Sequence, residues 1–422
     1  MWKKLSGGIT GVMCFWIILF LVQNKLQQWF TPFQYVDELF GLLIVPLAVW
    51  RLVQGKLHIV WTEKTVLFAI LLAVFWVSGW CGYFCWHYQP FLNTAKDSYV
   101  NLKFFLAAGA SWLMFIDDTA DLEQVRRWLW PLVNVAAVIL FVLCVADLCF
   151  GIFEGNMRGG LRAVKLFYSA YTFLAGICVF LCAICLWLYE EHRKKIMIPL
   201  ILLTFVMLST RRVKAMGAAA CLLLIYIFIF RKRQRISRKV KILATVVLAV
   251  AGVSGIYQLV SYYILMGMES ARAVLTVAAP FIAWDHFPFG TGWGTYGSAF
   301  SVEPYSPVYS MYRMEGVWGL SSDYPDFVAD TFWPMILAQC GFFGFLAFIG
   351  VLILLGRRIW RLKKDKSAFA SALLLAGYLL ISSTSESAFA NPAAVPLAFW
   401  LGFLFAQHRI RIRRMKPRKV GK

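Results

Sequence analysis

The stretch WLWPLVNVAAVILFVLCVADLCFGI, residues 128–152, decides the fold class because it carries a single charged side chain in 25 residues. About 20 consecutive apolar residues are enough for a helix to cross the hydrocarbon core of a bilayer. Similar runs recur along the chain and predict about twelve membrane-spanning helices. They lie at roughly 8–24, 36–53, 65–86, 98–116, 128–152, 165–189, 196–209, 212–230, 240–266, 331–356, 368–383 and 388–406.

The composition points to the same class. The chain has 422 residues, of which 61% are hydrophobic, and its mean hydropathy is positive. A soluble protein of this composition would leave a large apolar surface in contact with water. We therefore expect an all-α, polytopic integral membrane protein. The first apolar run follows Lys3 and Lys4 without a small-residue cleavage site, which favours an uncleaved first helix over a signal peptide.

The basic residues predict the orientation of the helices. Most of the 42 Lys and Arg residues fall at the two termini and in the loops after spans 2, 4, 6, 8 and 10. Because Lys and Arg concentrate on the cytoplasmic side of membrane proteins, both termini should be cytoplasmic. Topology and contact with anionic membrane lipid then account for the net charge of +21, and we expect no nucleic-acid partner.

The predicted organisation has four parts. Residues 1–266 carry helices 1–9, residues 267–330 form one long loop on the outer (periplasmic or extracellular) face, residues 331–408 carry helices 10–12, and residues 409–422 form a basic cytoplasmic tail. A long ordered loop is usually functional. The ten cysteines are scattered, mostly within apolar spans, and no paired cysteine–histidine spacing suggests zinc. We expect no metal and no cofactor.

Five basic residues depart from the cytoplasmic bias. Arg158, Arg162, Arg211, Arg212 and Lys214 fall in or next to short loops on the predicted outer face. Clustered arginines just outside a bilayer suit an anion carried on a lipid, and a lipid-linked pyrophosphate is the natural candidate.

The motif LSTRRVKAMGAAACLLL (208–224) places Ser209 and Thr210 just before a helix that runs inward. A Ser/Thr cap at that point, beside the positive end of the helix dipole, predicts an anion pocket with Arg211 and Arg212. The alternative is that these arginines contact the phosphates of ordinary membrane lipid.

The motif EGNMRGGLRAVKLFYSAYTF (154–173) supplies Arg158 and Arg162 before span 6. The two arginines are four residues apart, so they share a face if this loop is helical. The pair Gly159-Gly160 favours a bent backbone instead. We expect one of the two arginines to bind the substrate, and Arg162 is the better candidate.

The long loop adds three further features. Its first part, ARAVLTVAAPFIAWDHFPFG (271–290), has helical apolar spacing suited to the membrane surface, and Arg272 could be a third phosphate ligand or an interface anchor. The overlapping stretch FPFGTGWGTYGS (287–298) predicts a tight turn, and its Trp and Tyr could stack on sugar rings. His286, the only histidine of the loop, is expected to be structural.

Asp330 closes the loop, within DYPDFVADTFWPMILAQCGFFG (323–344). It stands where the N-cap of span 10 is predicted, and a structural role as that cap is one interpretation. The other is a general base that takes a proton from a sugar hydroxyl. Asp323 and Asp326 are less constrained alternatives, and Glu386 is a further acid at the outer end of span 11.

The order of these motifs resembles the O-antigen polymerase and O-antigen ligase superfamily of bacterial envelope enzymes over residues 155–405. The resemblance implies a GT-C-like, metal-independent glycosyltransferase at the outer face of the bacterial cytoplasmic membrane. The donor would be a glycan on undecaprenyl pyrophosphate, and the acceptor a sugar hydroxyl. The pyrophosphate ligands would be Arg162 or Arg158, Arg211 or Arg212, and Arg272, with Lys214 in support.

One departure separates this chain from the ligases of the superfamily. Those enzymes carry a histidine at the start of the helix after the long loop, and the matching position, counted back from Gly341, is Asp330. The resemblance therefore favours a polymerase of exopolysaccharide or capsule repeat units, for which a chain-length regulator is a candidate partner. The alternatives are a ligase that transfers the glycan to lipid A–core or another acceptor, and a lipid-linked oligosaccharide flippase.

Overall fold

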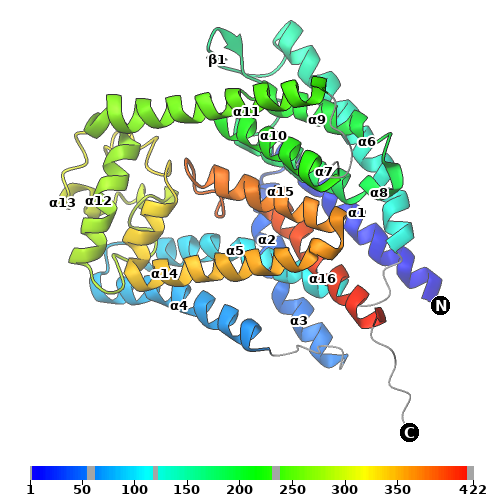
Figure 1. The fold of residues 1–422 in the computed structure, drawn as a ribbon. Coiled ribbons are helices and arrows are strands. Elements are labelled where there is room, and N and C mark those ends of the chain that lie inside the picture. Colours follow the sequence, from blue (N-terminus) through cyan, green and yellow to red (C-terminus); the bar gives the residue numbers. More distant parts are fainter. Residues whose placement is uncertain (1, 55–61, 117–121, 231–237, 416–422) are drawn as a thin grey trace.

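The computed structural model describes residues 2–54, 62–116, 122–230 and 238–415 (Figure 1). Helices account for most of these residues, and the described part contains one sheet of two short strands, so the all-α prediction is confirmed. Six of the described helical segments are long and apolar enough to cross a membrane. They are Thr10–Gln27, Glu63–Trp86, Leu122–Phe150, Val213–Phe230, Thr245–Leu265 and Trp333–Lys364.

Every other predicted span also coincides with helix, although these helices are shorter or more polar. They are α2 (Val36–Leu42) with α3 (Ile44–Val53), α5 (Phe91–Phe115), α7 (Tyr171–Trp187), α9 (Met197–Ser209), α15 (Lys366–Ser382) and α16 (Ala394–Met415). The long apolar helices are α1 (Trp2–Gln27), α4 (Glu63–Trp86), α6 (Leu122–Phe150), α10 (Val213–Ile225) continued by a π-helix to Phe230, α11 (Arg238–Leu259) continued by a π-helix to Leu265, and α14 (Trp333–Trp360). The number of membrane crossings, twelve, stays a prediction.

The centre of the bundle is α7. Nearly every residue from Tyr171 to Trp187 is buried and none of them is charged, as expected of a helix enclosed by others on all sides. Helix α15 packs along it, α16 packs against α5, and α4 packs against α14. The outer helices expose apolar side chains instead, and within Thr245–Leu265 no residue is buried. A hydrocarbon environment is what makes such exposure favourable.

Residues 271–328 form an ordered cap over one end of the bundle. The cap contains α12 (Ala271–Asp285), a 3-10 turn (Ala299–Ser301) and α13 (Pro307–Met311), which confirms the predicted helical character of its first part. It has a small core of its own. Asp97 of α5 fastens it to the bundle, because its carboxylate accepts hydrogen bonds from the backbone N–H of Gly294 (2.8 Å) and the hydroxyl of Ser298 (2.6 Å).

The cap and the ends of the chain lie at opposite ends of the molecule. In Figure 1, α12 and α13 are on the left, whereas α1 begins and α16 ends on the right. The side of the membrane that each end faces stays a prediction from the basic residues.

The glycine-rich segment of the cap is the predicted tight turn. Gly290, Gly292, Gly294 and Gly297 all have positive φ, and a Cβ at Gly292 would collide with the backbone of Tyr83 in α4. Close approach to α4 thus requires glycine here. The prediction that the tryptophan and tyrosine of this segment stack on sugars is wrong. Both rings are fully buried, and the Trp293 indole donates a hydrogen bond to the carbonyl of Trp76.

Candidate functional site

The first two predicted arginines lie on a β-hairpin of strands β1 (Met157–Arg158) and β2 (Leu161–Arg162). Gly159 and Gly160 turn the chain with φ of 56° and 73°, so the bent alternative is confirmed and the helical one is wrong. Arg158 pairs with Leu161, and Met157 pairs with Arg162. Cross-strand partners share a face and successive residues alternate, so the two arginines point to opposite sides of the hairpin.

Arg162 binds a buried carboxylate. Its Nη2 lies 3.0 Å from Oδ1 of Asp147, whose side chain is fully buried near the end of α6, and it also donates to the carbonyl of Phe153. This pair neutralises a charge inside the protein and ties β2 to α6. Sequence reasoning did not single out Asp147. The signal was available, because Asp147 is the only charged residue in the apolar run 128–152, and such a residue usually has a partner or a function.

The loop before α10 does not form the predicted Ser/Thr cap. Helix α9 extends through Ser209, and the hydroxyls of Ser209 and Thr210 donate back to the carbonyls of Phe205 (2.9 Å) and Met207 (2.7 Å). Because these hydroxyls are already engaged in the preceding turn, the cap prediction is wrong. The N-cap residue of α10 is Arg212, and no side chain caps the helix. Its first turn therefore presents backbone N–H groups and the positive end of its dipole.

Tyr171, the first residue of α7, brings Arg158 and Arg212 together. The Arg212 guanidinium lies 4.9 Å from the centre of the Tyr171 ring, and the Arg158 guanidinium lies 5.9 Å from it. The face of an aromatic ring attracts cations, which offsets part of the repulsion between the two arginines. Tyr171 was not singled out in the sequence because aromatic residues are common at the ends of apolar helices.

Two ion pairs complete the arrangement. Lys214 Nζ lies 2.6 Å from Oε2 of Glu386, in the segment between α15 and α16, and both side chains are largely buried. Arg272 Nη2, in the first turn of α12, lies 2.8 Å from Oδ2 of Asp330. The Asp330 side chain is one-third exposed. The N-cap position of α14 belongs to Phe332, so the interpretation of Asp330 as that cap is wrong.

These residues form one constellation, which we call the charge cluster. Arg212 interacts electrostatically with Arg158, Glu386 and Asp330, and Lys214 interacts with Arg212 and Arg272 in addition to Glu386. The charge cluster consists of Arg158, Arg212, Lys214, Arg272, Asp330 and Glu386. Four cations and two carboxylates leave a formal excess of two positive charges, drawn from five separate parts of the chain.

Several buried donors of these arginines lack a partner within the protein. The Nε atoms of Arg212 and Arg272 are buried without a hydrogen-bond acceptor, and so is the Nε of the neighbouring Arg211, whose backbone is left-handed with φ of 54°. Buried polar groups are almost always hydrogen-bonded, and an orphaned charged donor is costly. Unmatched guanidinium donors and an excess of positive charge together fit an anionic ligand.

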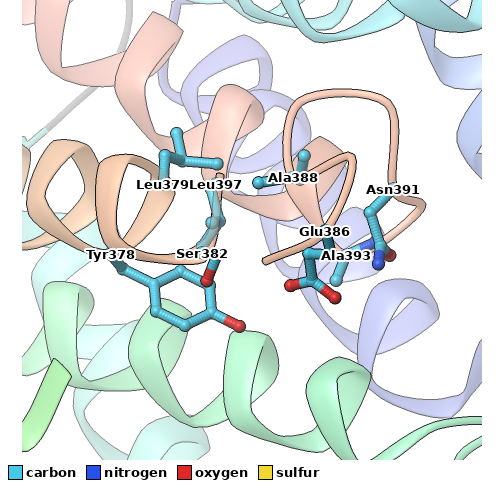
Figure 2. A pocket seen from close by; sticks show the side chains of 9 residues that line it. Tyr378, Leu379, Ser382, Glu386, Ala388, Asn391, Ala393 and Leu397 are labelled. Atoms are coloured by element: carbon cyan, nitrogen blue, oxygen red, sulfur yellow. The ribbon is translucent and has the colours of Figure 1, made fainter. Parts of the chain in front are cut away.

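A small cavity adjoins the cluster. Figure 2 shows Glu386 and Asn391 on one side of it and Tyr378 and Ser382 on the other. Its volume of about 10 Å³ leaves room for about one water molecule, so a larger ligand must bind elsewhere on the cluster.

No protein-family model matches this chain, and neither does any functionally characterised protein. The charge cluster is therefore the feature that points to a function.

The remaining candidate residues lie outside the cluster. His286 is buried, its Nδ1 donates to the carbonyl of Ile282 (2.9 Å), and its Nε2 lies 3.1 Å from the Tyr88 hydroxyl, which fits the structural role predicted for it. Asp323 and Asp326 are exposed on the cap. Among the residues that the structure describes, no group of three His, Cys, Asp or Glu side chains is placed to hold a metal ion.

Proposed function

We propose that this protein is a membrane glycosyltransferase that polymerises lipid-linked glycan repeats. It would transfer a glycan from undecaprenyl pyrophosphate to a sugar hydroxyl of another lipid-linked repeat at the outer face of the bacterial cytoplasmic membrane. The observation that carries the proposal is the charge cluster, in which buried arginine donors without partners coincide with an excess of two positive charges. A pyrophosphate esterified at both ends carries one negative charge on each phosphate and complements that excess.

The cations of the cluster act on the leaving group. During transfer, the bond between the anomeric carbon and the pyrophosphate oxygen breaks, and its electron pair stays on that oxygen. Negative charge on the pyrophosphate therefore increases, and cations already held in place stabilise it without reorganising. Arg158 and Arg212 are held by Tyr171, and Lys214 is held by Glu386. Arg162 would act indirectly, by anchoring the hairpin that carries Arg158.

Asp330 is the proposed general base. A new bond forms between the acceptor oxygen and the anomeric carbon, and the hydroxyl proton passes to the Asp330 carboxylate. The side chain is one-third exposed, so an acceptor can reach it, and its ion pair with Arg272 orients it within the cluster. Glu386 is less accessible, because its side chain is 16% exposed and engaged by Lys214.

The glycan profile of cells lacking this protein tests the proposal directly. We expect single repeats on lipid or on the final acceptor and no long polymer, and we expect re-expression of the wild-type chain to restore polymer. Full-length polymer that stays unattached would instead indicate a ligase. Lipid-linked repeats trapped on the cytoplasmic side would indicate a flippase.

Asp330→Asn separates catalysis from structure. The amide keeps the shape of the side chain and can still accept a hydrogen bond from Arg272, but it cannot take a proton. We expect polymerisation to slow by roughly 10²–10⁴-fold with little change in thermal stability. Turnover of purified protein with lipid-linked repeats measures the effect. Glu303→Gln, at an exposed acid elsewhere on the cap, is the matched control and should retain activity. Wild-type turnover in Asp330→Asn would rule out this base.

A further inference from the structure

Two aromatic side chains on the cap face outward. Trp318 is 67% exposed and Tyr324 is 37% exposed, and their ring centres lie 4.3 Å apart with 34° between the ring planes. This exposed pair contrasts with Trp293 and Tyr296 of the same cap, which are fully buried. Most of the Trp318 side chain is not covered by the rest of the protein, so its outer face is open to a ligand.

The loop that carries the pair is rigidly held. Leu320 and Val328 are buried in the core of the cap, one on each side of Tyr324 in the chain. The backbone N–H of Phe327 donates to the carbonyl of Gly319 (3.0 Å), and a Cβ at Gly319 would collide with the Phe327 ring. A surface whose side chains are already in position loses little conformational entropy when it binds a ligand.

The segment that carries the pair is acidic. From Val317 to Val328 the sequence is VWGLSSDYPDFV, which contains two exposed aspartates, Asp323 and Asp326, and no Lys or Arg. The Asp326 carboxylate accepts a hydrogen bond from the Tyr324 hydroxyl, which raises the pKa of Tyr324. Anionic lipid surfaces attract basic segments and repel acidic ones, so this surface is poorly suited to lipid headgroups.

Sugar rings fit the same chemistry. The C–H groups on one face of a pyranose carry partial positive charge and pack on the negative face of an aromatic ring. The hydroxyls at the edge of the sugar can donate hydrogen bonds to carboxylates such as Asp323 and Asp326. The loop also leads to the charge cluster, because Asp330 comes six residues after Tyr324 in the chain. The backbone N–H of Asp330 donates a hydrogen bond to the Phe327 carbonyl (3.2 Å).

We propose that the exposed pair Trp318 and Tyr324 is a glycan-binding subsite that holds a sugar ring of the acceptor. The assignment of this sugar to the acceptor rests on the proposed function, whereas glycan binding by the pair can be measured without turnover. Such a subsite would hold the growing or incoming glycan while its reactive hydroxyl reaches Asp330.

Calorimetric titration of the full-length protein in lipid nanodiscs tests the subsite. The probe is the lipid-free oligosaccharide that mild acid releases from the lipid-linked glycans of the host cells. We expect Trp318→Ala and Tyr324→Ala to weaken binding roughly tenfold, which corresponds to the loss of one favourable aromatic stack. Trp318→Phe should retain part of the affinity. Trp284→Ala removes a similarly exposed tryptophan from α12 and should bind as the wild type does.

Two outcomes would overturn the subsite. The first is identical titrations for the wild type and Trp318→Ala, whether both bind or neither does. The second is quenching of Trp318 fluorescence by brominated phospholipids, seen as a quenched component that Trp318→Ala lacks, because it would place the ring in the membrane. Failure of the transferase proposal looks different. Normal polymer in Arg212→Ala cells would remove the proposed reaction and leave a Trp318-dependent titration intact.

Discussion

Arg212→Ala is expected to abolish polymer formation while single lipid-linked repeats still accumulate. Arg212 lies at the centre of the charge cluster, where it interacts with Arg158, Glu386 and Asp330 and keeps a buried Nε without a protein partner. Removing one preorganised group that stabilises developing negative charge typically costs about 10²–10³-fold in turnover. Polymer length on gels and the turnover of purified protein measure the loss.

Two further variants test whether a positive charge alone is sufficient at position 212 and whether the effect is specific to the charge cluster. Arg212→Lys keeps the charge but loses the planar, multiply donating guanidinium, so we expect partial activity. Lys165→Ala removes a cation that pairs with the exposed Glu154 outside the cluster, and it should leave polymer length unchanged. Normal polymer in Arg212→Ala, with the protein present in the membrane at the wild-type level, would remove Arg212 from the reaction.

Lys103→Met is expected to cause the largest loss of stability. The Lys103 side chain is 1% exposed inside the bundle, with Nζ 2.5 Å from Oδ2 of Asp37 and 3.2 Å from Oε1 of Glu38. Methionine fills a similar volume but leaves these two acids without their cation. Breaking a buried ion pair on one side costs about 3–5 kcal/mol, because the remaining charge stays buried. The unfolding temperature of the purified protein in detergent should fall clearly.

The same helix offers a matched control. Lys96 also lies on α5 but is exposed, so Lys96→Met should change the free energy of unfolding by less than about 0.5 kcal/mol. The triple variant Lys103→Met, Asp37→Asn, Glu38→Gln removes the unpaired charges as well and should recover much of the lost stability. If Lys103→Met unfolds at the wild-type temperature, the buried pair does not stabilise the bundle.

The helical segments could be predicted because each depends on local composition. The run at 65–86 lies in α4, and the run at 128–152 lies in α6 up to the end of that helix at Phe150. A long apolar stretch can satisfy its backbone in a membrane only as a helix. The division of the run at 36–53 into two helices could not be predicted in this way. The run divides into α2 and α3 at Leu43, and hydropathy alone does not register a break inside one apolar run.

Parts of the site could be predicted and parts could not. The arginines at 158, 212 and 272 were found because basic residues are rare on the predicted outer face. The roles assigned to their neighbours depended on local geometry, which the sequence left open. Ser209 and Thr210 were expected to cap α10, but α9 extends far enough to engage their hydroxyls. Trp293 was expected to face a sugar, but close packing against α4 buries it, and the exposed aromatic pair lies elsewhere on the cap.

By itself, the sequence determined the helical character of the chain, the positions of its apolar segments, the acids of one long loop and the basic residues of the short loops on the same predicted face. These properties follow from residues that are neighbours along the chain. Only the tertiary structure decided that Arg158 faces Tyr171 while Arg162 faces Asp147, and that Lys214 pairs with Glu386 and Arg272 with Asp330. The physical reason is that an ion pair depends on distance in space, and these partners come from separate elements that only packing brings together.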